Sequence, residues 1–144
     1  MSVSKTKKQL VDVARQLFAN NGVEDTTMND IAVASKKGRR TLYTYFKSKE
    51  DIYFAVIESE LDMLVETMRK VAAKDISPDE KILELIYTHL DAIKEVVLRN
   101  GNLHAEFFRD IRKVERARMR FNYHEKMIFR EVLSEGVEKN VFEV

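Results

Sequence analysis

Apolar residues recur along most of the chain at intervals of three and four, which places them on one face of a helix. The stretch from Lys5 to Asn20 has this pattern and ends before Gly22, a residue suited to the left-handed backbone that often follows a helix. No stretch alternates apolar and polar residues as a half-buried strand would. The pattern therefore predicts an all-α fold.

Two short helices are predicted next. Thr27 and Asp30 combine a capping hydroxyl with an acid three residues later, which predicts a helix from Met28 to about Ser35. Gly38 separates it from a second short helix, Arg39 to Phe46. The pair, joined by a tight turn, matches a helix-turn-helix.

Longer helices follow. Ser48 and Asp51 start one of more than 20 residues. Ser77, Pro78 and Glu80 start a second, which stops at Asn100-Gly101, and a third runs from about Arg112 to Gly136. A short piece with Leu103, Phe107 and Phe108 is expected between these last two.

Composition narrows the class of protein. A chain of 144 residues with 44% hydrophobic residues can bury a stable core without covalent or metal cross-links. Because it has no cysteine, disulfides and thiolate zinc sites are excluded. No apolar run approaches the length of a membrane span, and the N-terminus lacks the apolar core of a signal peptide. We expect a soluble cytoplasmic protein.

The net charge of +1 hides an uneven distribution. Residues 1–50 carry ten basic and five acidic residues, whereas residues 51–100 carry six and eleven. Residues 34–49 hold six basic residues and no acidic one. Such asymmetry points to one region that faces a polyanion, although a merely solvated basic face is the simpler interpretation of the charges alone.

The helix-turn-helix favours the interpretation that the basic region binds a polyanion. Ile31, Ala32, Leu42 and Phe46 supply its internal contacts, which leaves cations, hydroxyls and phenols on the outer side of the second helix. These groups suit a phosphate-lined groove. They are Lys37, Arg39, Arg40, Thr41, Tyr43, Thr44 and Tyr45.

At these residues the sequence resembles the TetR/AcrR family of bacterial transcription regulators. The resemblance is carried by Asp30-Ile31-Ala32, by the run from Thr41 to Asp51, and upstream by Ala14 to Ala19, Gly22 and Thr26-Thr27. It covers residues 7 to about 57. Beyond residue 60 only the order and lengths of the helices resemble the family.

The turn departs from the family pattern. Members commonly have Gly-Val-Ser-Lys-Gly where this chain has Lys36-Lys37-Gly38-Arg39-Arg40, so a glycine occupies the usual capping position. Arg40 replaces the usual glycine with a long bidentate donor able to read guanine, so we expect Arg40 and Thr41 to read bases. The resemblance implies phosphate contacts for Thr27, Lys37, Tyr43, Tyr45 and Lys49, and places Thr26, Arg39 and Thr44 on the same surface.

The resemblance also implies two domains: a DNA-binding head at residues 1–47 and a helical effector-binding domain at residues 48–144. Members form homodimers through two C-terminal helices and bind palindromic operators. The tail Val141-Phe142-Glu143-Val144 ends on apolar residues with no closing polar segment. We therefore expect an incomplete second domain with most of the dimer helices absent; the alternative is a naturally short variant. No cofactor is expected.

An effector pocket is implied among the later helices. The matching aromatic and methionine residues are Met63, Tyr87, Phe107, Phe108, Met119, Tyr123 and Met127. Side chains of these types at helical spacing are also ordinary core residues. The three histidines are expected to be satisfied core or surface residues, and no ligand is identified.

Enzymatic functions lack their motifs. His124-Glu125 would need a second histidine at position 128, which is Ile128, and His104-Ala105-Glu106 has no cysteine to complete a deaminase zinc site. We therefore expect a DNA-binding regulator, most simply a repressor released by a small molecule, and not an enzyme. The alternative is a helical interaction module whose basic head binds an acidic protein.

Overall fold

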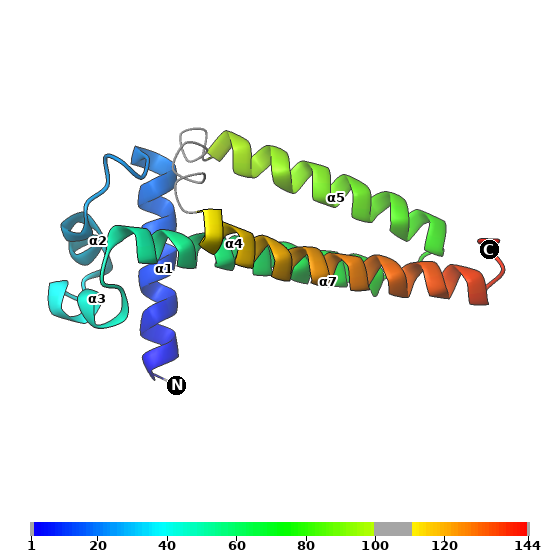
Figure 1. Cartoon of the computed structure of the whole chain (residues 1–144), viewed down its shortest axis with the longest axis horizontal. Helices are drawn as coiled ribbons and strands as arrows, with labels where there is room; N and C mark the ends of the chain where they lie inside the picture. Colours follow the sequence, from blue (N-terminus) through cyan, green and yellow to red (C-terminus); the bar gives the residue numbers. More distant parts are fainter. Residues whose placement is uncertain (1, 100–110, 144) are drawn as a thin grey trace. The chain divides into compact units, whose positions relative to one another are not determined.

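The computed structural model describes residues 2–99 and 111–143, in which all regular structure is helical. Figure 1 shows the helices with their labels. They are α1 (Ser2–Asn21), α2 (Met28–Ser35), α3 (Arg39–Tyr45), α4 (Lys49–Ala72), α5 (Pro78–Arg99) and α7 (Ile111–Glu138). The all-α prediction is confirmed. The apolar piece predicted around Leu103 to Phe108 lies outside the described residues.

The chain divides into two compact units. The first comprises Met1–Ser59 and Arg99–Val114, and the second comprises Glu60–Leu98 and Glu115–Val144. The division thus falls within α4 and not at residue 47, because the first turns of α4 belong to the first unit's core through the buried Ile52 and Tyr53.

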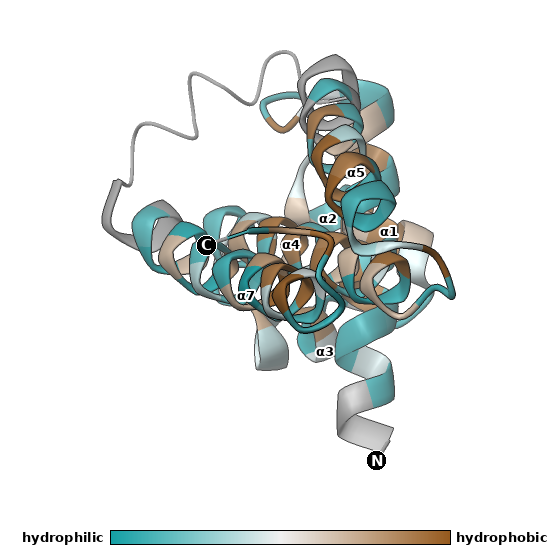
Figure 2. Cartoon of the chain, turned by 90° about the vertical axis from the view of Figure 1, so that its right-hand side faces the viewer, coloured by the Kyte–Doolittle hydropathy of each residue, from teal (hydrophilic) through white to brown (hydrophobic). Residues whose placement is uncertain are grey.

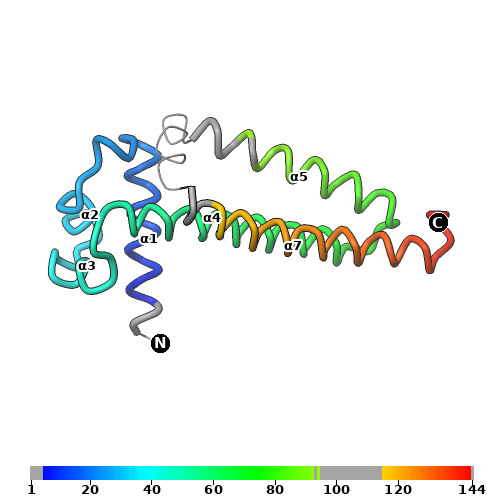
Figure 3. Tube along the Cα trace, viewed as in Figure 1, coloured from blue at the N-terminus to red at the C-terminus, as the bar shows by residue number. Residues whose placement is uncertain are grey.

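The first unit is built around α1, α2 and α3. α2 packs against both α1 and α3, and the connection between α2 and α3 is short (Figure 3). The ring of Phe18 meets that of Tyr53 edge to face at 6.2 Å between centroids. The buried core includes Leu10, Ala14, Phe18, Val23, Ile31, Ala32, Leu42, Phe46, Ile52 and Tyr53.

The caps of this unit follow the local sequence signals. The Thr27 hydroxyl accepts from the Asp30 amide at 3.0 Å, and the Thr27 amide donates to the Asp30 carboxylate at 2.9 Å, so the predicted capping box is confirmed. Gly22 has φ +83°, the left-handed conformation expected after α1. The Asp51 amide donates to the Ser48 hydroxyl at the start of α4.

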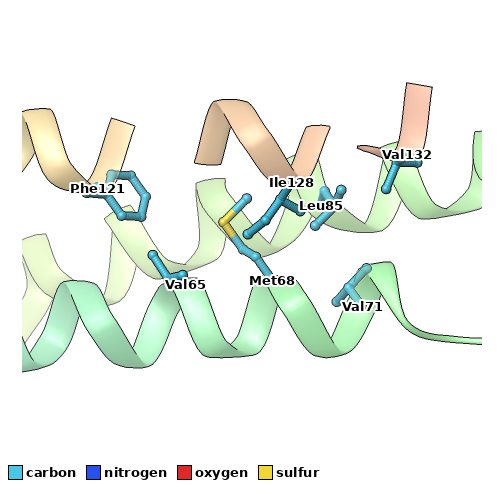
Figure 4. Close-up of a cluster of buried hydrophobic side chains, with 7 residues drawn as sticks. All are labelled: Val65, Met68, Val71, Leu85, Phe121, Ile128 and Val132. Carbon is cyan, nitrogen blue, oxygen red and sulfur yellow. The ribbon is translucent and has the colours of Figure 1, made fainter. Parts of the chain in front are cut away.

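The core of the second unit lies where α4, α5 and α7 meet. Figure 4 shows Val65, Met68 and Val71 of α4 facing side chains of the other two helices. These are Leu85 of α5 and Phe121, Ile128 and Val132 of α7. Met68 and Leu85 are fully buried, as expected for residues at the centre of a three-helix core.

An ion cluster joins α5 to α7 beyond this core. Lys81 is almost wholly buried, and its ammonium donates to both carboxylate oxygens of Glu135, at 3.2 and 2.9 Å. Lys139 donates to the same carboxylate at 2.9 Å. These hydrogen bonds, from Lys139 first and then Lys81, lower the pKa of Glu135. A buried cation needs such a partner, so the contact fixes which turn of α7 faces α5.

The end of α7 differs from the prediction. Gly136 does not end the helix, which continues to Glu138. A Cβ atom at Gly136 would lie 2.0 Å from Cδ2 of Phe142, because the chain turns back and the aromatic ring packs directly on the glycine. The amides of Val141 and Phe142 donate to the Gly136 carbonyl at 2.8 and 3.1 Å. The glycine therefore provides room for a tail contact.

Candidate nucleic-acid interface

The turn between α2 and α3 has an unusual backbone at two positions. Lys36 ends α2 in the left-handed conformation, with φ 58° and ψ 18°, and its amide donates to the Val33 carbonyl at 3.2 Å. Gly38 precedes α3 with φ 83° and ψ 159°, a region that essentially only glycine adopts. At position 38 the backbone therefore requires the glycine that this chain has, and not the serine that is usual in the family.

Burial of Ile31, Ala32 and Leu42 between α2 and α3 fixes which side of α3 faces outward. Arg39, Arg40, Tyr43 and Thr44 are exposed, and Thr41 and Tyr45 are half-buried. The Thr44 hydroxyl donates to the Arg40 carbonyl at 2.9 Å. Lys37, in the turn, is exposed as well. The structure therefore brings together seven of the ten residues proposed for DNA contact.

The side chains on this surface are partly ordered by one another. The guanidinium carbon of Arg39 lies 6.0 Å from the centre of the Tyr43 ring, within the range of a cation–π interaction. The Lys7 ammonium of α1 lies 5.8 Å from the ring centre of Phe46, at the end of α3. Sequence reasoning missed Lys7, because its proximity to α3 is a tertiary contact that no local pattern encodes.

Two neighbouring threonines have opposite environments. Thr26 is fully buried, and its hydroxyl donates to the Gly22 carbonyl at 2.7 Å. Its burial contradicts the expectation that it faces DNA. Thr27 is exposed, and its hydroxyl oxygen accepts from the Asp30 amide, which leaves its own hydrogen available for a phosphate oxygen.

Lys49 is also engaged within the protein. Its ammonium donates to the carbonyl of Val23 at 2.7 Å and lies 3.5 Å from that of Glu24, both in the loop between α1 and α2. The start of a helix disfavours a cation, and these carbonyls supply the compensating negative partial charge that a DNA phosphate was expected to supply. Its structural role is therefore evident without DNA.

The residues proposed for an effector pocket are mostly open to solvent. Met63, Tyr87, Met119 and Tyr123 are 49%, 58%, 68% and 61% exposed, and Met127 is half-buried. Phe107 and Phe108 lie outside the described residues. These four side chains are therefore exposed in the described part of the chain, and their assignment to an effector pocket stays a prediction.

α5 carries an apolar strip, defined as Leu83, Ile86, Tyr87 and Leu90, whose members are each 43% or more exposed. Hydrophobic positions along α5 appear in brown in Figure 2. Their spacing places them on one face, opposite the buried Leu85 and Lys81. The second unit thus presents an open apolar surface.

Two histidines of the second unit have partners. His89 Nδ1 lies 2.5 Å from a carboxylate oxygen of Glu125, and its ring stacks on that of Phe121. His124 Nδ1 lies 3.4 Å from a guanidinium nitrogen of Arg69. They are packed and hydrogen-bonded side chains, as expected. In the described part of the chain, no three His, Cys, Asp or Glu residues gather as metal ligands.

None of the helices of residues 2–99 and 111–143 has the length and apolar character needed to cross a membrane.

Comparison with known proteins yields similarity over most of the chain. The family model for "Bacterial regulatory proteins, tetR family" matches residues 10–56, which include α2 and α3. The crystal structure of a TetR/AcrR-family transcriptional regulator from Thermobifida fusca YX-ER1 is 30% identical, with a TM-score of 0.74. That match covers 95% of this chain and 73% of the other.

Two curated relatives are similar over shorter stretches. An HTH-type transcriptional regulator of Staphylococcus aureus (strain bovine RF122 / ET3-1) is 31% identical over 86 residues, 60% of this chain and 46% of the relative. The fatty acid metabolism regulator protein of Bacillus subtilis (strain 168) is 27% identical over 104 residues, 66% of this chain and 54% of the relative. The chain therefore spans about half the length of these relatives.

Proposed function

The chain belongs to the TetR/AcrR family of transcriptional regulators. From this membership we propose that it binds double-stranded operator DNA and regulates transcription. In this proposal it acts in the cytoplasm and has no enzymatic activity. The first unit is the DNA-binding part in this proposal, with α3 entering the major groove. The second unit senses a small molecule. The two roles are those expected for residues 1–47 and 48–144, but they are assigned here to the two units, whose boundary lies within α4.

One observation carries the DNA-binding proposal. The second helix of the helix-turn-helix exposes Arg39, Arg40, Tyr43 and Thr44 together, within the residues that match the family model. Recognition helices place such side chains against base edges and phosphates. An acidic protein partner would be satisfied by cations alone, so the hydroxyl and phenol groups between them favour DNA.

Selection from random duplex DNA tests this proposal. The 144-residue chain is expected to enrich one sequence motif, and Arg40→Ala is expected to change the preference at one base position. Lys70→Ala, which removes an exposed cation of α4 outside the interface, is the matched control and should leave the motif unchanged. If the wild-type chain enriches no motif but binds an acidic polypeptide, the alternative interaction module is correct.

We further propose that the protein is a repressor released by a small, largely apolar effector. The support is the open apolar strip of α5, since apolar surface of this kind is covered in ligand complexes and assemblies. The similarity to a fatty acid metabolism regulator makes fatty acids the first compounds to test. Binding should raise the Tm of the chain and lower its affinity for the selected DNA.

A homodimer on a palindromic operator completes the proposal. Two heads that bind one face of the duplex require half-sites about 34–36 Å apart, and an effector that changes the spacing of the heads would weaken binding. The selected motif should therefore contain two inverted half-sites. A single half-site would indicate that this chain binds DNA as a monomer.

A further inference from the structure

Arg39 and Tyr43 form a pair on the exposed side of α3. They are four residues apart in one helix, so their side chains lie on the same face. The guanidinium carbon of Arg39 is 6.0 Å from the Tyr43 ring centre, and the Tyr43 side chain is itself 41% exposed. The pair is therefore preformed and accessible at the surface that the proposed function assigns to DNA.

The geometry of the pair leaves the arginine's donors available. A cation over a ring uses the face of the guanidinium or its charge, whereas the N–H groups point outward in the guanidinium plane. Among residues 2–99 and 111–143, no carboxylate or hydrogen-bond acceptor engages the Arg39 guanidinium. These donors form the planar fork that matches the O6 and N7 atoms of guanine.

Position along α3 also favours Arg39. It is the first residue of the helix, and recognition helices contact base edges mainly through their N-terminal residues. Ring contact restricts the rotamers of a long side chain, so less conformational entropy is lost when the arginine binds. Arg40, which sequence reasoning favoured as the base reader, has no such aromatic support in the described structure.

We propose, on the premise that α3 enters the major groove, that Arg39 and Tyr43 act as one recognition element for a guanine. Arg39 is the specificity-determining residue, because its in-plane N–H groups donate to guanine O6 and N7. Tyr43 is a positioning residue for this contact, because its ring holds the guanidinium. The phenol hydroxyl is not needed for base recognition and remains free to contact a phosphate.

Motif selection with matched variants tests the proposal. Arg39→Ala and Tyr43→Ala should both lose the preference for guanine at the same position, a change on the order of tenfold or more in relative affinity. Tyr43→Phe keeps the ring, so it should retain the guanine preference even if overall affinity falls. The double variant should lose no more at that position than Arg39→Ala alone.

Two controls keep the outcome interpretable. Tyr43→Leu retains bulk without an aromatic face and should behave as Tyr43→Ala, whereas Lys70→Ala, which removes an exposed cation of α4, should leave that guanine preference intact. If Tyr43→Ala and Tyr43→Leu give the wild-type motif, or if Arg39→Ala weakens every sequence alike, the recognition pair is refuted while DNA binding stands. If the wild-type chain selects no motif, the proposed function and the recognition pair fail together.

Discussion

The Lys49 ammonium lies 2.7 Å from the carbonyl oxygen of Val23, so the first residue of α4 is bonded to the loop between α1 and α2. This contact joins residues 26 positions apart in the sequence. Because Val23 is buried beside Thr26, the bond helps to hold the loop that leads into the helix-turn-helix. Lys49 thus helps to hold the helix-turn-helix that we propose binds DNA.

The first prediction separates this role from phosphate binding. Lys49→Met should destabilise the chain by about 1–2 kcal/mol, because a charge-assisted hydrogen bond to a part-buried carbonyl is lost. The salt dependence of DNA binding should hardly change. Lys47→Ala, at an exposed position, is the control and should leave stability within about 0.5 kcal/mol of wild type. Urea unfolding and salt titrations of DNA affinity give both quantities; a Lys49→Met chain of unchanged stability would contradict the assigned role.

A second prediction concerns the turn. Lys36→Gly should stabilise the chain by about 0.5–1 kcal/mol: relief of the left-handed lysine gives about 1–2 kcal/mol, part of which is lost to the greater freedom of glycine in the unfolded chain. The midpoint of urea unfolding measures the change. Lys37→Gly, at the next position, offers no such relief and is the comparison; equal effects of the two variants would rule out the backbone explanation.

Gly38→Ser gives the third prediction. Serine would restore the family's usual capping residue, but the backbone at φ 83° and ψ 159° disfavours any side chain by about 1–3 kcal/mol. In the described part of the chain, no atom beyond Gly38 and its two neighbours lies within 4 Å of the position of a Cβ, so the strain arises from the local backbone and not from tertiary packing. A cap gains only a few tenths of a kcal/mol over glycine. We expect a lower Tm, and an increase would mean that the turn readily adopts the family conformation.

The helical layout could be predicted because its signals are local. Thr27 and Asp30 mark the start of α2, and the apolar spacing gives the buried faces. Burial of Thr26 beside exposed Thr27 could not be predicted, since both have the same hydroxyl chemistry and only packing distinguishes them. The hydrogen bond of Lys49 could not be predicted for a similar reason, because its acceptor lies 26 residues away.

The fourth prediction concerns Gly136. The local rule that a glycine ends a helix fails here, because this glycine instead makes room for the ring of Phe142. Gly136→Ala alone should destabilise the chain, because the new methyl group would meet the Phe142 ring at about 2 Å. In a Phe142→Ala background the same change should stabilise it by about 1 kcal/mol, the helix preference of alanine over glycine. A double-mutant cycle in urea measures this reversal of sign; equal effects in both backgrounds would deny the packing contact.

The fifth prediction is a pH dependence. Hydrogen bonds from Lys139 and Lys81 lower the pKa of Glu135 below its ordinary value of 4.5. A carboxylate with a lowered pKa in the folded state stabilises the fold above its unfolded pKa, and this contribution disappears as the pH falls through the folded pKa. The stability difference between wild type and Glu135→Gln should therefore be constant above about pH 5 and narrow below about pH 4.5. Unfolding of both chains at several pH values measures the difference, with exposed Glu131→Gln as the control; a gap independent of pH would disprove the linkage.

The salt dependence of affinity for the selected DNA tests the central claim, that the outer face of α3 and its turn bind duplex DNA. Each cation that neutralises a phosphate steepens the slope of log K against log salt by about 0.9. With Lys37, Arg39, Arg40 and their neighbours exposed, we predict a slope of about −3 or steeper, hence a loss of roughly 60-fold between 50 and 200 mM salt. Lys37→Ala should make the slope shallower by about 1. A wild-type slope shallower than about −1 would contradict the claim that this surface binds DNA.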